Sequence, residues 1–346
     1  MKNILITGGA GFIGFHLASH PALQNADNVV LFDKLNSYYD PALKYGRLKL
    51  LGFDVTPDSP EMEAETSSLY KGWVFYKGSL EKADHVNTLF EEYDFDTVVN
   101  LGAQAGVRYS IDYPQTYADS NLQGFLNILE ACRNHPVDHL IYASSSSVYG
   151  ANKKTPFCES DSVDNPISLY AATKKSNELM AHSYSHLYGI PCTGLRFFTV
   201  YGPWGRPDMA YFSFAQKIAA GETIQIFNNG DMMRDFTYVE DISESITRLF
   251  DRAPVKDSSE NGSAAPARIL NIGHGSPVNL LDFVKEIEKQ IGKVAQKEYL
   301  PMQMGDVPVT WADTSRLEAL TGYKPKYDLA YGIGKFATWF KEYYKL

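Results

Sequence analysis

Two residues that could do acid–base chemistry stand four positions apart, Tyr170 and Lys174 in the stretch SLYAATKKSNE. Residues with this spacing share one face of a helix. A phenol has an ordinary pKa of about 10, so it acts as a base near neutral pH only where its surroundings favour the phenolate. An ammonium group one helical turn away favours the phenolate. The pair therefore predicts that Tyr170 removes a proton from a hydroxyl group and returns it.

Three glycines form a second chemical feature, in the stretch ILITGGAGFIG. Gly8 permits a tight turn, Gly11 lets backbone approach a pyrophosphate, and Gly14 allows a helix to pack closely on a strand. The N-terminus of that helix offers unpaired N–H groups to phosphates. Asp33 stands 19 residues after Gly14, where its carboxylate would accept hydrogen bonds from a ribose diol and repel a 2′-phosphate. This order of features predicts an NAD site, with NAD favoured over NADP.

A sheet must position these residues. Five short apolar runs are typical of strands buried on both faces, and four longer amphipathic stretches separate them. The runs are 3–7, 28–33, 96–103, 139–145 and 193–198, and the longer stretches are 12–24, 82–93, 117–134 and 169–188. The alternation predicts an α/β protein with a Rossmann-type, doubly wound parallel sheet and helices on both faces.

The alternation becomes irregular in the C-terminal part of the chain. We expect an NAD-binding Rossmann domain over residues 1–196, to which residues 235–275 return, and a smaller C-terminal α/β lobe over residues 197–346 that binds the substrate. Two stretches rich in Ser, Pro and acidic residues, 54–72 and 254–267, are expected to be mobile surface loops.

Charge and composition limit the partners. The chain has 346 residues and a formal net charge of −9, whereas surfaces that bind nucleic acid need clustered Lys and Arg, so no nucleic-acid partner is expected. There is no run of about 18 apolar residues, so no membrane partner is expected. Three widely spaced cysteines indicate a reducing compartment. With no secretory signal ahead of the first apolar run, we expect a cytoplasmic protein.

Two histidines could be interpreted as a metal pair. His182 and His186 stand four apart in the helix expected after Lys174, but no third ligand with a suitable spacing follows. We therefore expect no metal site and assign both residues to the helix surface.

Three motifs together resemble the extended short-chain dehydrogenase/reductase family: TGGAGFIG, YAATK and the serine-rich stretch YASSSSVYG at 142–150. The resemblance implies that the Ser145 hydroxyl bonds both the substrate oxygen and the Tyr170 phenol, and that Lys174 also holds the nicotinamide ribose. It implies cofactor contacts, besides the three glycines and Asp33, at Phe12, Ile13, Leu80, Leu101, Gly102, Ala103, Asn121, Tyr170, Lys174 and Phe198.

Longer stretches narrow the resemblance within that family. LGAQAGVRYSIDYPQTYADSNLQGFLNILEACR, RFFTVYGPWGRPDMA and MMRDFTYVEDI are similar to the UDP-glucuronate 4-epimerases. The resemblance implies that carbon 4 of UDP-glucuronate is transiently oxidised with NAD, that the 4-keto sugar rotates, and that hydride returns to its other face to give UDP-galacturonate. It also implies a homodimer through the helices at 117–134 and 169–188, and a place in polysaccharide biosynthesis.

The resemblance extends to residues that would touch the UDP-sugar. The implied contacts are Ser146, Ser147 and Thr199 on the uronate carboxylate, Arg206 near the diphosphate and sugar, Arg234 on the UDP diphosphate, and Asp306 near the uridine ribose. A planar cation such as Arg234 suits the bidentate binding of a diphosphate.

Neutral hydroxyls at Ser146 and Ser147 weigh against two related reactions. The family's nucleotide-sugar 4,6-dehydratases carry an Asp-Glu pair at these positions, and its UDP-glucuronate decarboxylases carry Glu at the second. The alternatives that stay open are a 4-epimerase for a neutral UDP-hexose or UDP-N-acetylhexosamine, and the decarboxylase. A non-catalytic NAD sensor on the same fold is disfavoured by intact Ser145, Tyr170 and Lys174.

Overall fold

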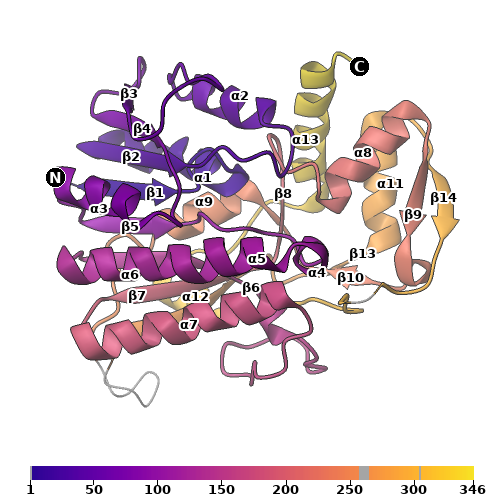
Figure 1. Ribbon diagram of the computed structural model, residues 1–346. Coiled ribbons are helices and arrows are strands. Elements are labelled where there is room, and N and C mark those ends of the chain that lie inside the picture. Colours follow the sequence, from indigo (N-terminus) through magenta and orange to yellow (C-terminus); the bar gives the residue numbers. More distant parts are fainter. Residues whose placement is uncertain (1, 257–264, 304) are drawn as a thin grey trace.

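A central parallel sheet organises the molecule (Figure 1). The computed structural model describes residues 2–256, 265–303 and 305–346. Within these residues, eight strands pair in the order β12-β7-β6-β5-β1-β2-β4-β3, and all neighbours are parallel except β3 and β4. The strands are β1 (Asn3–Thr7), β2 (Asn28–Asp33), β3 (Ala64–Thr66), β4 (Trp73–Lys77), β5 (Thr97–Asn100), β6 (His139–Ser145), β7 (Cys192–Phe197) and β12 (Ala267–Ile272).

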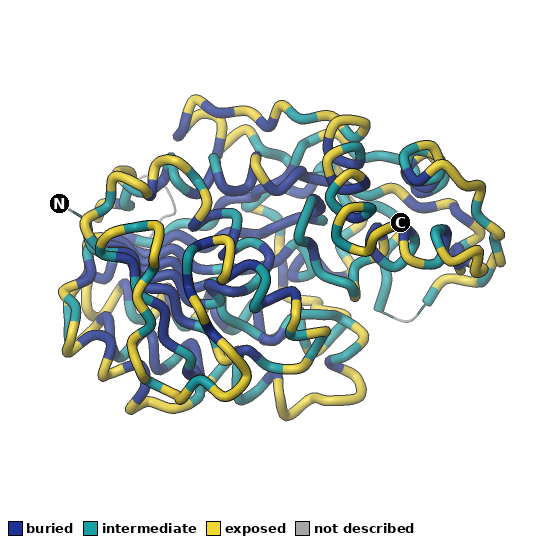
Figure 2. Tube along the Cα trace, turned by 90° about the horizontal axis from the view of Figure 1, so that it is seen from above, coloured by how far each residue is buried: buried dark blue, intermediate teal, exposed yellow. Residues whose placement is uncertain are grey.

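The two faces of the sheet bury two separate hydrophobic cores. Successive side chains of a strand point to opposite faces, so Leu5 of β1 belongs to one core while Ile4 and Ile6 belong to the other. The Leu5 face packs against α3 (Ala83–Glu92), α6 (Gly124–Asn134) and α7 (Leu169–Tyr188). The opposite face packs against α1 (Phe12–Ala18), α2 (Ala42–Leu50) and α9 (Val239–Thr247). Figure 2 shows the buried strands running between more exposed outer segments.

The predicted doubly wound α/β fold is confirmed, and the differences lie at element ends. The expected strand at 96–103 stops at Asn100, because the chain leaves the sheet there and lines a cavity. The expected helix at 12–24 ends at Ala18, and a 3₁₀ turn (Pro21–Asn25) follows, because proline cannot continue the backbone hydrogen-bond ladder. The expected helix at 117–134 is three pieces: α5 (Pro114–Tyr117), a π-helical segment (Ala118–Gln123) and α6.

The expectation of a loop at 54–72 is wrong at residues 64–66. These residues form β3, which pairs antiparallel with β4 and ends the sheet on that side. The edge of β4 offers unpaired backbone groups, and three residues of strand satisfy them despite a polar composition. In the second stretch, 254–267, residues 257–264 lie outside the described part of the chain.

A smaller group of elements lies beside the sheet, at the right of Figure 1. Its helices are α8 (Ala210–Ala220), α11 (Leu280–Ile291) and α13 (Leu329–Tyr344). Its short strand pairs are β9 (Thr223–Ile226) with β14 (Gln296–Tyr299), and β10 (Met233–Arg234) with β13 (Val278–Asn279). Nearer the sheet, β8 (Thr199–Tyr201) pairs with β11 (Phe236–Tyr238), and α12 (Ser315–Thr321) lies near β12.

The chain crosses repeatedly between the sheet and this C-terminal lobe. Residues 267–272, near the end of the segment expected to return to the Rossmann domain, form β12 and pair with β7. The domain boundaries at 196 and 235–275 themselves stay a prediction. Among the helices of the described residues, none is long and apolar enough to cross a membrane.

Candidate active site

A cavity of about 990 Å³ lies between the carboxyl ends of the sheet strands and the C-terminal lobe. In a doubly wound sheet, the crevice forms where successive connections turn to opposite sides, which here is between β1 and β5. Most of the predicted site residues line it: Gly8, Gly11, Phe12, Ile13, Gly14, Asp33, Leu80, Leu101, Gly102, Ala103, Ser145, Ser146, Ser147, Tyr170, Lys174, Phe198, Thr199, Arg206 and Asp306.

The glycine turn after β1 is packed against neighbouring backbone. Gly8 has a φ of +66°, and a Cβ there would lie 2.8 Å from the Gly102 nitrogen. A Cβ on Gly14 would lie 2.2 Å from the Gly8 carbonyl oxygen. Only glycine allows this approach, so α1 begins close to β1 and points its N-terminus at the cavity.

Asp33 ends β2 at the cavity edge. Its Oδ1 accepts a hydrogen bond from the Leu35 backbone nitrogen at 2.8 Å, which fixes the carboxylate. The Lys44 ammonium lies 4.0 Å from the same oxygen but donates to the backbone and side-chain oxygens of Asn36 at 3.0 and 2.7 Å. The residues present therefore fit a dinucleotide, with phosphates at the glycine turn and a ribose diol at Asp33.

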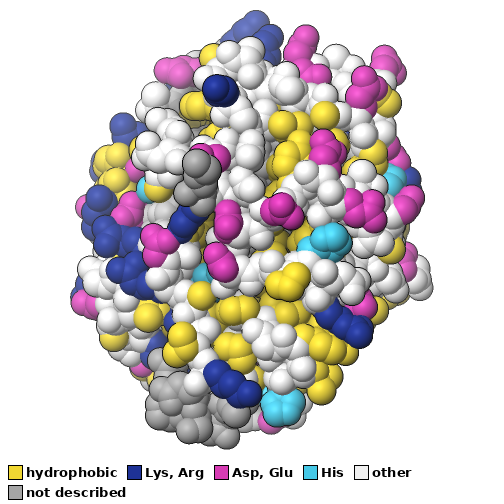
Figure 3. All heavy atoms as spheres, turned by 90° about the vertical axis from the view of Figure 1, so that its left-hand side faces the viewer, with side chains coloured by type: hydrophobic (Ala, Val, Ile, Leu, Met, Phe, Trp, Pro, Cys, Tyr) yellow, Lys and Arg dark blue, Asp and Glu magenta, His cyan; other side chains and the backbone are white. Residues whose placement is uncertain are grey.

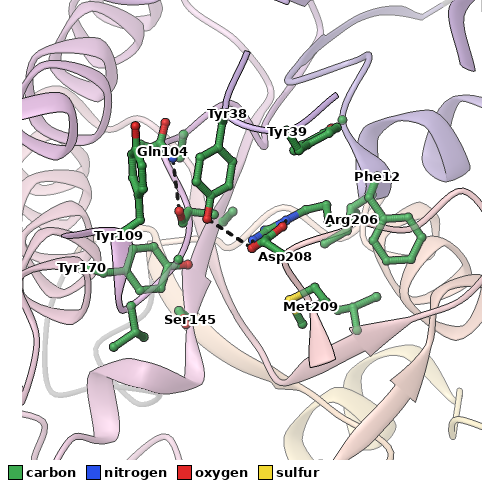
Figure 4. Close-up of a pocket in the computed structure, with 18 of the residues that line it drawn as sticks. Phe12, Tyr38, Tyr39, Gln104, Tyr109, Ser145, Tyr170, Arg206, Asp208 and Met209 are labelled. Atoms are coloured by element: carbon green, nitrogen blue, oxygen red, sulfur yellow. Dashed lines mark hydrogen bonds and ion pairs between the residues drawn. The ribbon is translucent and has the colours of Figure 1, made fainter. Parts of the chain in front are cut away.

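The three predicted catalytic residues meet on one wall of the cavity. Ser168 caps α7 by accepting a hydrogen bond from the Ala171 nitrogen, so Tyr170 lies in the first helical turn and Lys174 in the second. Ser145 ends β6, and Lys174 donates to the Ala143 carbonyl of that strand at 2.8 Å. Figure 4 shows the Tyr170 and Ser145 side chains directed into the same space.

Burial dominates the ionisation of this group. It raises the pKa of Tyr170, while a hydrogen bond with Ser145 and the charge of Arg206 act against that rise and the charge of Asp208 adds to it. The sequence predicted that Lys174 would lower this pKa, but in the structure Ser145 and Arg206 act in that direction. Burial also lowers the pKa of Lys174 to about 8, which keeps the ammonium group mostly charged near neutral pH.

The serine-rich stretch divides between the core and the cavity. Ser144 is buried and donates to Glu178 at 2.7 Å. Ser145 caps the 3₁₀ turn Ser146–Tyr149 and donates to the Ser147 hydroxyl at 3.1 Å. Ser146, Ser147 and Thr199 line the cavity without bringing a charge.

The turn ahead of α8 carries the predicted Arg206 together with Asp208, which sequence reasoning missed, as it missed Tyr38 beside them. Arg206 donates from Nε and Nη2 to the two carboxylate oxygens of Asp208, at 3.0 and 2.6 Å. Tyr38, from the loop after β2, donates to Asp208 Oδ2 at 3.2 Å (Figure 4). Asp208 stands two positions after Arg206, a signal that the sequence offered, whereas Tyr38 is 170 positions away and carried no motif.

Arg234 and Asp306, 72 positions apart, are brought together. Arg234 Nη2 donates to Asp306 Oδ1 at 2.8 Å, and Nη1 donates to the Met233 and Pro308 carbonyls. Asp306 lines the cavity, and Arg234 lies behind it, outside the lining residues. Burial lowers the pKa of Arg234, although Asp306 opposes that shift.

Asn121 is the other predicted residue that does not line the cavity. It is buried in the π-helical segment, and its amide oxygen accepts from the Gln104 nitrogen at 2.8 Å. Its amide nitrogen donates to the Gln104 carbonyl and to Thr173 Oγ1, at 3.0 and 3.1 Å. These bonds use the amide, so the geometry gives Asn121 the task of holding the Gln104 loop against α7 rather than a direct contact with the cofactor.

The described part of the chain holds no cluster of three or more His, Cys, Asp or Glu residues that could bind a metal ion. His182 and His186 lie on the last three turns of α7.

The glycine turn, the doubly wound sheet and the Ser145, Tyr170 and Lys174 set define a dinucleotide-dependent enzyme of the short-chain dehydrogenase/reductase class. The chain belongs to the NAD dependent epimerase/dehydratase family, whose sequence signature matches residues 4–273.

Individual relatives span nearly the whole chain. Protein CapI of Staphylococcus aureus is 50 % identical over 349 residues and covers 99 % of each chain. A probable UDP-glucuronate 4-epimerase of Rhizobium meliloti is 46 % identical, covering 99 % of this chain and 97 % of its own. The crystal structure of UDP-glucuronic acid 4-epimerase from Bacillus cereus, in complex with UDP-glucuronic acid and NAD, is 32 % identical with a TM-score of 0.84, covering 99 % of this chain and 100 % of its own.

Proposed function

We propose that this protein is an NAD-dependent UDP-glucuronate 4-epimerase that interconverts UDP-glucuronate and UDP-galacturonate. One observation carries the proposal: the cavity holds a complete Ser145, Tyr170 and Lys174 set beside two uncharged serines, Ser146 and Ser147. Relatives at 43 to 46 % identity are named UDP-glucuronate 4-epimerases, and the Bacillus cereus enzyme binds UDP-glucuronic acid and NAD.

Proton transfer falls to Tyr170. It removes the proton of the 4-hydroxyl group as carbon 4 is oxidised, and it later returns that proton to the 4-oxygen, after the sugar has turned its other face to receive the hydride. NAD, when bound, takes up the hydride from carbon 4 and gives it back, so it is regenerated. Ser145 has one hydroxyl proton to donate: donated to Tyr170, it stabilises the phenolate that burial disfavours, and once Tyr170 is protonated it is free to bond the sugar oxygen. Lys174 completes the set by bonding the nicotinamide ribose.

Epimerisation needs a firmly held UDP group and a sugar that can turn. We assign the firm hold to the Arg234 and Asp306 pair: the uridine ribose at Asp306, which lines the cavity, and, by the resemblance, the diphosphate at Arg234, which lies behind Asp306 and outside the lining. The 4-keto sugar then rotates about its bond to the diphosphate and presents its other face. Arg206 lines the same cavity near enough to Tyr170 for its charge to act on the phenol, so we place the sugar beside these two residues and call this part of the cavity the sugar end.

The uronate carboxylate requires its own contacts. We assign these to the hydroxyl groups of Ser146, Ser147 and Thr199, which can donate hydrogen bonds without adding a charge. The 4-keto intermediate is a β-keto acid, which loses carbon dioxide readily when the bond from carbon 5 to the carboxylate lies perpendicular to the plane of the carbonyl. Hydroxyl contacts that hold another orientation protect it, so Ser147→Glu should raise the fraction of UDP-pentose among the products.

The test is purified protein with UDP-glucuronate and no added NAD, followed by NMR of the sugar protons. UDP-galacturonate forming without net NADH supports the proposal. A UDP-pentose product would favour the decarboxylase, and turnover of only neutral UDP-hexoses would favour the other epimerases. No turnover after NAD is supplied would reject an enzymatic function for this substrate.

We also propose a homodimer through the helices at 117–134 and 169–188. Large apolar side chains on α7 are exposed, among them Leu179 at 59 % and Leu187 at 64 %. Figure 3 shows hydrophobic side chains gathered in the lower half of the face at the left of Figure 1, with acidic and basic side chains interspersed. Light scattering of Leu187→Glu should give a monomer mass if the prediction holds.

A cytoplasmic location and a place in polysaccharide biosynthesis, which needs activated uronic acids, stay predictions.

A further inference from the structure

The backbone just before Arg206 is hydrogen-bonded to Arg47, a residue that also contacts the glycine turn of the dinucleotide site. Arg47 of α2 is fully buried, and its guanidinium donates to the Trp204 carbonyl at 2.7 and 3.1 Å and to the Gly205 carbonyl at 3.1 Å. The same guanidinium donates to the Ala10 carbonyl of the glycine turn at 2.8 Å. One side chain therefore fixes the backbone just before Arg206 relative to the dinucleotide site.

The side chain of Arg206 is fixed separately. Its two hydrogen bonds to Asp208 form a bidentate pair, which sets the plane of the guanidinium as well as its position. The two side chains are 23 % and 27 % exposed, so water screens them less than an ordinary surface pair. Asp208 is in turn held by the Tyr38 hydroxyl, and the Tyr38 ring packs edge-on against Tyr109 with centroids 4.8 Å apart.

The pair lies close enough to Tyr170 to act on it. The charge of Arg206 lowers the pKa of Tyr170 and the charge of Asp208 raises it. Because the two groups are adjacent and opposite in sign, their effects on Tyr170 largely cancel. The titratable or polar groups around Tyr170 are Ser145 from β6, Lys174 from α7, Tyr117 from α5, Ser110 from α4 (Tyr109–Asp112), and Arg206 and Asp208 from the turn before α8.

We propose that Asp208 and Tyr38 are positioning residues of the reaction: Tyr38 holds Asp208, and Asp208 holds Arg206 as an oriented, charge-compensated donor at the sugar end of the cavity. This inference rests on the proposed function and adds to it. Arg206 keeps the N–H groups that Asp208 does not use for the sugar of the UDP-sugar. Asp208 prevents an unopposed cation from facing Tyr170.

Two substitutions separate this role from a structural one. Asp208→Asn keeps the shape and one acceptor oxygen but removes the charge, and Tyr38→Phe removes only the hydroxyl. The matched control is Asp282→Asn, which makes the same chemical change in an exposed pair with Lys285 on α11. Calorimetry with UDP and with UDP-glucuronate isolates the contribution of the sugar to binding, because UDP has no sugar on its diphosphate.

We expect Asp208→Asn to weaken UDP-glucuronate binding about tenfold and UDP binding less than twofold, because it takes the negative charge from both hydrogen bonds with Arg206. We expect Tyr38→Phe to act in the same direction by about threefold, because it removes one hydrogen bond to Asp208 and leaves the ion pair with Arg206. The acidic limb of kcat against pH should move to lower pH by about half a unit in Asp208→Asn, because Arg206 then favours the Tyr170 phenolate unopposed. Asp282→Asn should leave all of these values unchanged.

Equal losses for UDP and UDP-glucuronate, or no change in either, would overturn the proposal, since neither is expected of a group acting at the sugar end. An unmoved acidic limb in a correctly folded Asp208→Asn would also overturn it. The binding comparison needs no turnover, so it stays decisive if wild type makes no UDP-galacturonate and the proposed function itself fails.

Discussion

A buried ion pair beneath the catalytic residues offers a sharp test of the structure. Glu178 of α7 accepts from Arg196 Nε and Nη2 of β7, at 2.8 and 2.9 Å, and from the Ser144 hydroxyl of β6. The charged side chains are only 3 % and 4 % exposed. We consider Glu178→Gln, which keeps the shape of the side chain and removes its charge.

The loss of unfolding free energy in Glu178→Gln follows from the groups that the substitution leaves in the core. Arg196 stays buried and charged, and the Gln amide offers one acceptor oxygen where two served Arg196. Removing one partner of a buried pair costs about 3 to 5 kcal/mol of unfolding free energy, against about 1 kcal/mol or less for an exposed pair. With an m-value of about 3 kcal/mol per M, the urea midpoint should fall by about 1 to 1.7 M.

The assay is urea unfolding followed by circular dichroism, with Glu61→Gln as the control. Glu61 pairs with Lys82, and both side chains are 50 % exposed, so this variant should move the midpoint little. Replacing both Glu178 and Arg196 with methionine should restore part of the loss, because no buried charge is left unpaired. A Glu178→Gln midpoint within 0.3 M of wild type, a shift of about 1 kcal/mol at that m-value, would refute the reasoning.

Three further predictions concern the cavity. Tyr170→Phe should lower kcat by about 10² to 10⁴-fold in the NMR assay while the Kd for UDP-glucuronate changes less than about threefold, and a small loss of kcat would contradict Tyr170 as the base. Burial lowers the Lys174 pKa from 10.5 to about 8, so the unfolded chain binds more protons than the folded chain between these two pH values. The stability of wild type relative to Lys174→Met should therefore rise by up to about 1.4 kcal/mol per pH unit between pH 8 and 9.5. Urea unfolding of both proteins at pH 8 and 9.5 checks this, and a stability difference that stays constant would contradict it. Asp33→Ala should weaken NAD binding about tenfold and improve NADP relative to NAD in fluorescence titrations, whereas unchanged NAD affinity would remove Asp33 from the ribose site.

Several parts of the fold could be predicted from the sequence, because they depend on the spacing of residues within one short segment. The apolar runs at 3–7, 28–33 and 139–145 agree with β1, β2 and β6, since strands buried on both faces must be apolar throughout. The helix at 169–188 begins after the Ser168 cap and ends before Gly189, whose φ is +73°. β3 was missed, because Ala64, Glu65 and Thr66 contain no apolar run and form a strand only where the edge of β4 is already present.

In the candidate site too, features set within one segment could be predicted, and features set by distant segments could not. The glycine turn and the spacing of Tyr170 and Lys174 could be predicted, because each lies within one short segment whose geometry is fixed by its own residues. The placement of Asn121 behind the cavity could not, because its amide partners come from Gln104 and from Thr173, 52 positions away.

The sequence by itself determined the sheet class, the dinucleotide turn and the spacing that puts Tyr170 and Lys174 on one face of a helix. Only the tertiary structure decided that Tyr38 meets Asp208, that Arg234 meets Asp306, and that burial rather than Lys174 dominates the ionisation of Tyr170. The reason is physical: spacing along the chain sets backbone geometry and facing direction, whereas partners and desolvation depend on which distant segments the fold brings against a side chain.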